Sequence, residues 1–116
     1  MPNYSKNEIV LVSYPFSDLS GLKVRPAVVI NGPHLSHDLL LTPLTSRIMS
    51  LLEGEFVLLK GREAGLNVVS AVKRGIFTIE ERLVVKRIGH LLPEDGEKLE
   101  ASLGVWLGLQ IAPKKG

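Results

Sequence analysis

The stretch Lys23-Val24-Arg25-Pro26-Ala27-Val28-Val29-Ile30 places a cation where a polar loop enters an apolar strand. A residue that precedes proline is excluded from the helical region by the proline ring, so the Arg25 backbone is preset to extended geometry. An arginine held in this way can direct its guanidinium group toward a ligand. The group stays charged, and its planar set of donors matches the oxygens of a phosphate. The stretch predicts a β-strand from Arg25 to Ile30. It also predicts an anionic ligand, with RNA as the first candidate. A surface arginine at a strand start is the alternative.

Length and composition favour one small domain. The 116 residues can bury one hydrophobic core but not two, so we expect a single domain over residues 1–116. The net charge of +2 permits a polyanionic partner without requiring one. The lack of cysteine excludes disulfides, thiolate nucleophiles and cysteine zinc sites, and it fits a reducing cytoplasm. Because no apolar stretch reaches membrane-spanning length and no signal-like segment follows Met1, we expect a cytoplasmic protein without membrane contact.

Short apolar segments on both sides of the opening stretch also have the character of strands. They are rich in β-branched residues and are separated by turn-forming Gly, Pro, Asn, Asp and Ser. Pro43 belongs near a strand end or a sheet edge, because it cannot donate to a ladder. The predicted strands are Glu8–Tyr14, Asp38–Leu44, Gly54–Lys60, Val68–Phe77 and Val84–Ile88, with a single helical turn at Thr78–Arg82.

The C-terminal segment changes to a helical period. Apolar residues recur at spacings of three and four from Leu99 to Leu107, and Pro93 with Glu94 suits the opening of a helix. The sequence therefore predicts a helix over about 94–110. Several short strands and one terminal helix predict a mainly β fold, in which a strongly bent antiparallel sheet curls into a partial barrel.

Several motifs, taken in their order along the chain, resemble the MazF/PemK toxins of bacterial toxin–antitoxin systems. The resemblance covers Asn7 to Leu109 and implies a small SH3-like barrel with a C-terminal helix, the architecture also found in the toxin CcdB. It further implies a homodimer, a metal-independent endoribonuclease that cleaves single-stranded mRNA without a cofactor, and a cognate antitoxin that occupies the RNA groove. The motifs are Asn-Glu-Ile-Val-Leu-Val-Ser-Tyr-Pro-Phe-Ser-Asp, Val-Arg-Pro-Ala-Val-Val-Ile, Leu-Thr-Pro-Leu-Thr-Ser and Gly-Ile-Phe-Thr-Ile-Glu-Glu-Arg-Leu-Val-Val-Lys-Arg-Ile-Gly-His-Leu.

The resemblance also assigns roles to individual positions. Arg25 matches the catalytic arginine of the family, and Thr45 matches its catalytic threonine. Near the start, Asn7-Glu8 replaces a common Gly-Asp pair and Ser13 replaces a common acid, which bears on substrate preference. The residues expected to bind substrate, most of them in the loop that flanks the RNA groove, are Ser17, Asp18, Ser20, Gly21, Lys23, Ser46, Ser70 and Lys73.

The chemistry expected of these residues is charge stabilisation. RNA carries its own nucleophile, the 2′-hydroxyl, so a nuclease that forms a 2′,3′-cyclic phosphate and a 5′-hydroxyl end needs positioning and charge neutralisation rather than an activated water. Arg25 and Thr45 can donate hydrogen bonds to the phosphate oxygens as their charge grows. The acceptor of the 2′ proton stays open. His34 and His37 have suitable intrinsic pKa values, but the favoured interpretation is that they are solvated loop histidines.

Other readings of the sequence remain to be weighed. Trp106 lies at helical spacing from leucines, which favours packing over base stacking. Ser70 is either a substrate contact or an ordinary strand serine. No His, Asp and Glu cluster has metal-ligand spacing, so no metal is expected. The functional alternatives are a CcdB-like toxin that inhibits gyrase through its C-terminal helix, or a catalytically silent barrel that binds RNA or antitoxin.

Overall fold

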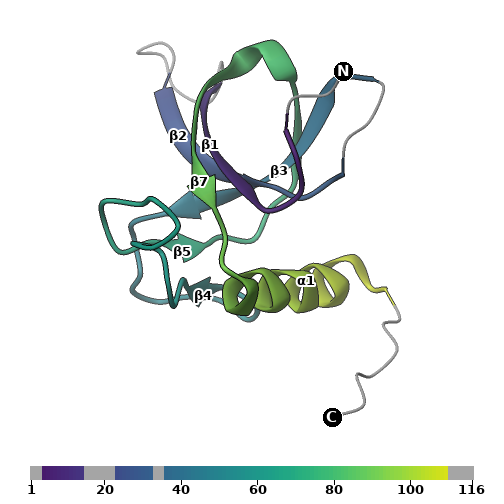
Figure 1. Cartoon of the computed structure of the whole chain (residues 1–116). Helices are drawn as coiled ribbons and strands as arrows, with labels where there is room; N and C mark the ends of the chain where they lie inside the picture. The colour runs from purple at the N-terminus through teal and green to yellow at the C-terminus, as the bar shows by residue number, and fades with distance from the viewer. Residues whose placement is uncertain (1–3, 15–22, 33–35, 110–116) are drawn as a thin grey trace.

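The computed structural model describes residues 4–14, 23–32 and 36–109. Within them the chain forms short antiparallel strands, one 3-10 turn and one C-terminal helix, which confirms the predicted mainly β class (Figure 1). The elements are β1 (Glu8–Tyr14), β2 (Lys23–Val29), β3 (Asp38–Thr45), β4 (Phe56–Val57), β5 (Ala71–Val72), β6 (Phe77–Glu80), η1 (Glu81–Leu83), β7 (Val84–His90) and α1 (Pro93–Leu107).

The strands form one strongly bent sheet in the order β4-β5-β3-β2-β1-β7, and β6 also pairs with β3. This path does not return to its first strand, so within the described residues the sheet is a partial barrel, as predicted, and not a closed one. Figure 1 shows the sheet curving above α1, with β4 and β5 beside the helix. Within the described residues, no helix is both long enough and apolar enough to cross a membrane.

Strand β3 is the centre of this topology because it changes partner along its length. It pairs with β6 up to Leu41↔Phe77 and with β5 from Leu44↔Val72. Pro43 falls between the two, and its carbonyl accepts a hydrogen bond from the Lys73 amide at 3.0 Å. The proline nitrogen lies on the same edge of β3 as this carbonyl and has no hydrogen to donate. It therefore falls where β3 changes from β6 to β5 as its partner, so no ladder hydrogen bond is lost.

Two predicted strands are much shorter in the structure. The prediction of one strand over Val68–Phe77 was wrong, since only Ala71–Val72 pairs as β5 before the chain turns and resumes as β6. Val68 and Val69 are each 61% exposed, so their β propensity had no packing to support it. The helical turn predicted at Thr78–Arg82 begins later, at η1, because Thr78 pairs with Leu40 inside β6.

The other boundaries lie close to the predicted ones. Strand β4 holds only Phe56–Val57 of the segment predicted as Gly54–Lys60, and β7 runs on to His90. Helix α1 begins at Pro93, where a missing amide hydrogen costs nothing, and it ends at Leu107 because Gly108 takes the left-handed conformation with φ 68°.

Alternation along the strands builds two apolar clusters, one on each face of the sheet. One cluster includes Ile9, Val28 and Leu44 and is covered by Leu99 of α1, with Trp106 packed against it. The packing role expected for Trp106 is therefore confirmed. The other cluster fills the inside of the curved sheet and comprises Val10, Val12, Ala27, Val29, Leu39, Leu41 and Ile79.

Candidate nucleic-acid interface

The pairing of β2 with β3 brings the two predicted catalytic residues together. The ladder runs through Val29↔Leu41, Val28↔Thr42 and Ala27↔Pro43. Each step toward the start of β2 is a step toward the end of β3, so two further steps bring Arg25 level with Thr45. Because side chains alternate between faces, Arg25 and Thr45 project from the same face as Ala27. The last ladder pair is Ala27↔Pro43, so Arg25 and Thr45 lie just beyond it, at the same end of the two strands.

Arg25 is exposed at the point where the core ends. Its backbone is paired with Val12 in β1, a side chain with no exposed surface, and Pro26 holds the chain extended. The backbone is thus fixed on one side by the sheet and by the following proline. Within residues 4–14, 23–32 and 36–109, no carboxylate forms an ion pair with its guanidinium, so the charge faces solvent.

Thr45 is half-buried at the last position of β3, and its hydroxyl has a defined orientation. The Oγ1 atom accepts a hydrogen bond from the Arg47 amide at 3.0 Å. A hydroxyl has one proton to donate and lone pairs to accept, so this contact leaves the proton available to a ligand. Ser46 and Arg47 follow as exposed residues on the same turn, beside the hydroxyl.

A basic segment lies against this end of β3. Lys73 and Arg74 are exposed between β5 and β6, and the Lys73 amide bonds the Pro43 carbonyl, two residues from Thr45. The Arg74 amide donates to Glu55 Oε2 at 2.9 Å. That hydrogen bond and a second one from the Leu52 amide hold the pKa of Glu55 below its ordinary value, and the positive charges of Lys73 and Arg74 act in the same direction.

The remaining predicted substrate-binding residues have different placements. Ser17, Asp18, Ser20 and Gly21 lie outside the described residues, and so does His34. Lys23 opens β2, where its backbone pairs with Tyr14. Ser70 is only 3% exposed, and its hydroxyl donates to the Val68 carbonyl at 3.0 Å, so this side chain is turned inward.

The described histidines lie away from Arg25 and Thr45. His37 precedes β3, at the opposite end of the strand from Thr45, with Nδ1 3.9 Å from a Glu81 carboxylate oxygen. His90 pairs with Glu8, four residues along β1 from Val12, the partner of Arg25. Its Nδ1 lies 2.8 Å from the Leu91 carbonyl oxygen, at the end of β7.

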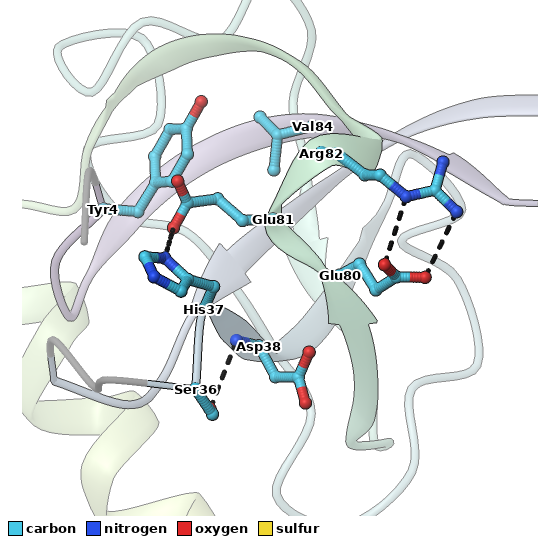
Figure 2. Close-up of a pocket in the computed structure, with 8 residues that line it drawn as sticks. All are labelled: Tyr4, Ser36, His37, Asp38, Glu80, Glu81, Arg82 and Val84. Atoms are coloured by element: carbon cyan, nitrogen blue, oxygen red, sulfur yellow. Dashed lines mark hydrogen bonds and ion pairs between the residues drawn. The ribbon is translucent and has the colours of Figure 1, made fainter. Parts of the chain in front are cut away.

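A pocket of about 530 Å³ lies at the Asp38 end of β3 and was not predicted from the sequence. Figure 2 shows its acidic side chains, with Glu80 bonded to Arg82 and Glu81 facing His37. The consecutive pair Glu80-Glu81 was the available signal, but only the β3–β6 register places it opposite Asp38. The lining residues are Tyr4, Ser36, His37, Asp38, Glu80, Glu81, Arg82 and Val84. Within the described part of the chain, no group of three or more His, Asp or Glu side chains is arranged to hold a metal ion.

Sequence reasoning also missed Glu55. It is separated from Arg74 by 19 residues, and no local pattern relates the two. The contact between the Arg47 amide and the Thr45 hydroxyl was likewise not predicted from the sequence.

Comparison with solved structures shows that the fold is a known one. A mycobacterial endoribonuclease in complex with its cognate antitoxin superposes with a TM-score of 0.71 at 17% identity, covering 97% of this chain and 100% of that one. The Mycobacterium tuberculosis toxin MazF-mt6 gives 0.72 at 23% identity, covering 90% and 99%. MazF from Deinococcus radiodurans gives 0.72 at 19% identity, covering 92% and 100%.

Sequence comparison addresses the family directly. No curated protein matches the chain. The family model described as PemK-like, MazF-like toxin of type II toxin-antitoxin system matches residues 5–107, nearly the whole chain. The matched range contains every strand, the helix, and both Arg25 and Thr45. This protein therefore belongs to the PemK/MazF-like family of type II toxins.

Proposed function

We propose that this protein is a metal-independent, sequence-specific endoribonuclease that cleaves single-stranded RNA, with mRNA as its cellular substrate. The observation that carries the proposal is the β2–β3 register, which brings Arg25 and Thr45 to one face in a chain of the PemK/MazF-like family. The fold it shares with mycobacterial proteins named as endoribonucleases supports the same reading.

Arg25 and Thr45 stabilise the transition state of an internal transesterification. The 2′-oxygen attacks the adjacent phosphorus, the bond to the 5′-oxygen breaks, and the products are a 2′,3′-cyclic phosphate and a 5′-hydroxyl end. Negative charge grows on the non-bridging oxygens during this step. The Arg25 guanidinium donates to these oxygens, and Thr45 adds a hydroxyl donor whose orientation is set by the Arg47 amide.

Neither described histidine acts as the general base within one protomer. Strand β3 separates His37 from Thr45, and at about 3.3 Å per residue its length is roughly 23 Å. His90 lies at the far end of the β1–β7 pairing from Val12. The 2′ proton therefore leaves to water or to another group at the Arg25 end of the sheet.

The basic residues around Thr45 bind the neighbouring phosphates of the RNA strand. Arg47 and Lys73 lie beside Pro43 and Thr45 by their backbone hydrogen bonds, and Ser46 is exposed between them. Such contacts raise affinity through counterion release and carry little sequence information. Base choice comes from the surfaces that flank them.

The partners follow from the family. A cognate antitoxin neutralises the toxin by covering the basic face. A mycobacterial endoribonuclease of the same fold is named as a complex with its cognate antitoxin, which supports the existence of such a partner. A second copy of this chain completes a homodimer, and exposed apolar residues near α1 such as Met49, Leu52 and Val105 offer surface for it. The protein acts in the cytoplasm, where mRNA is found.

The test is cleavage of a long, unstructured RNA by purified protein in excess EDTA, followed by primer extension and analysis of the new ends. Discrete cuts with 5′-hydroxyl ends that disappear with Arg25→Ala are the expected result. Intact RNA, from protein shown to be folded and free of antitoxin, contradicts the proposal. A supercoiling assay with gyrase and an RNA-binding assay then separate gyrase inhibition from silent binding.

A further inference from the structure

Glu55 bridges two segments that are distant in sequence. Its Oε1 accepts from the Leu52 amide at 2.8 Å, and its Oε2 accepts from the Arg74 amide at 2.9 Å. Hydrogen bonds from backbone amides to a carboxylate are stronger than those between neutral groups. The carboxylate thus holds the backbone of the Lys73–Arg74 segment, while both basic side chains stay exposed.

The loop that carries Glu55 is itself held by helix α1. The Ser102 hydroxyl donates to the Gly54 carbonyl at 2.7 Å, and Trp106 Nε1 donates to the Glu53 carbonyl at 3.1 Å. Gly54 has φ +86°, and a Cβ at this position would collide with the indole ring, so the contact is close. The Glu55 side of the bridge is therefore the fixed side, and the Lys73–Arg74 segment is the part that it positions.

We propose that Glu55 is a positioning residue for RNA binding, which acts by holding the Lys73–Arg74 segment beside Pro43, two residues from Thr45. The Lys73 amide is bonded to Pro43 on one side and the Arg74 amide to Glu55 on the other, so the segment is fixed at two adjacent positions. This inference rests on the proposed endoribonuclease function. It adds that a carboxylate, which repels RNA by its charge, improves RNA binding through its hydrogen bonds.

The two effects of Glu55 have opposite signs, which makes the role measurable. Removing a negative charge near a phosphate-binding surface favours RNA by simple electrostatics. Removing the bridge releases the basic segment and disfavours RNA, because misplaced contacts lose much of their binding free energy. Glu53 provides a matched control, since its exposed side chain lies on the same loop and only its backbone carbonyl is bonded to Trp106.

The experiment compares cleavage kinetics of the wild type with Glu55→Gln, Glu55→Asp and Glu53→Gln. For Glu55→Gln we expect KM to rise about five- to tenfold with little change in kcat, since the reacting groups are untouched. Glu55→Asp keeps the charge but shortens the reach, and it should raise KM in the same direction. Glu53→Gln should leave KM unchanged or slightly lower. Thermal unfolding of each variant identifies any loss of folded protein.

Combination with Lys73→Ala/Arg74→Ala decides between positioning and a general structural role. If Glu55 acts through the basic segment, Glu55→Gln should have almost no further effect on KM once both cations are absent. A fall in KM for Glu55→Gln like that of Glu53→Gln, or a full additive loss in the combined variant, overturns the inference. A wild type that does not cleave RNA instead contradicts the proposed function, so the two failures are distinct.

Discussion

The two ends of strand β3 carry opposite charges, and the acidic end also lines an open pocket. At the Thr45 end the surface is basic and open, with charged side chains supplied by Arg25, Arg47, Lys73 and Arg74. At the Asp38 end a cavity of about 530 Å³ is lined by three carboxylates, and its cations already face carboxylates, Arg82 on Glu80 and His37 near Glu81.

This contrast teaches that a concave surface alone does not identify where a polyanion binds. A concave pocket is the usual first choice for a small ligand, but a polyanion needs unneutralised cations along its path. The acidic end repels phosphate, whereas the basic end attracts it. On the proposed function we expect RNA to bind at the basic end, and the following variants compare the two ends.

The largest expected effect separates the arginines at the two ends. Arg25→Ala should reduce the cleavage rate by about 10²- to 10³-fold, because it removes a charged donor from the growing charge on the phosphate. Arg82→Ala, the matched change at the acidic end, should leave the rate within about twofold, since Arg82 contacts Glu80 rather than substrate. Single-turnover cleavage of a short RNA measures both. Equal losses of cleavage rate in the two variants would contradict different roles for the two ends of β3.

A second comparison uses two threonines of β3 that point to opposite faces. Thr45→Val should lower kcat by about 10²-fold, because the valine keeps the shape but donates no hydrogen bond. Thr42 is fully buried, and its hydroxyl has no hydrogen-bond partner among the described residues. Thr42→Val should therefore keep full activity and change the free energy of unfolding by less than about 1 kcal/mol, in either direction. Slow cleavage by the Thr42 variant would argue against a role specific to Thr45.

A third prediction concerns the support beneath the basic end. Asp95 is fully buried at the start of α1 and accepts the Leu59 and Lys60 amides at 2.8 and 2.9 Å. Asp95→Asn should reduce the free energy of unfolding by about 1.5–3 kcal/mol, because an amide oxygen replaces only one of the two acceptors. Urea unfolding measures the change. Glu94→Gln, which loses only an exposed contact with Lys60, should leave the midpoint nearly unchanged.

The smallest expected effect is the pH dependence that Glu55 contributes. Hydrogen bonds from Arg74 and Leu52 lower the pKa of Glu55 from 4.5, with Lys73 and Arg74 adding positive charge nearby. A lowered pKa stabilises the folded state above the ordinary value, and this stabilisation is lost as the pH falls through the folded-state pKa. The stability difference between wild type and Glu55→Gln should thus be largest near pH 6 and shrink below about pH 4.5. A constant difference would contradict the assigned hydrogen bonds.

Several features of the site could be predicted from the sequence because they depend on neighbours in the chain. Pro26 alone presets the backbone of Arg25, and short apolar, β-branched runs bounded by turn-forming residues are enough to locate β1, β2 and most of β3. The long periodic segment after Pro93 was recognisable as a helix for the same reason. By contrast, β4 and β5 pair over only two residues each, so the predicted segments around them were much longer than the strands that form.

The sequence by itself determined the mainly β class, the terminal helix and the family motifs that point to Arg25 and Thr45. Only the tertiary structure decided that these residues share one face, that Ser70 turns inward, and that Glu55 reaches Arg74. The physical reason is the distance along the sequence over which each interaction acts. Backbone propensity acts over a few residues, whereas strand register and a hydrogen bond between residues 19 apart depend on how distant segments pack.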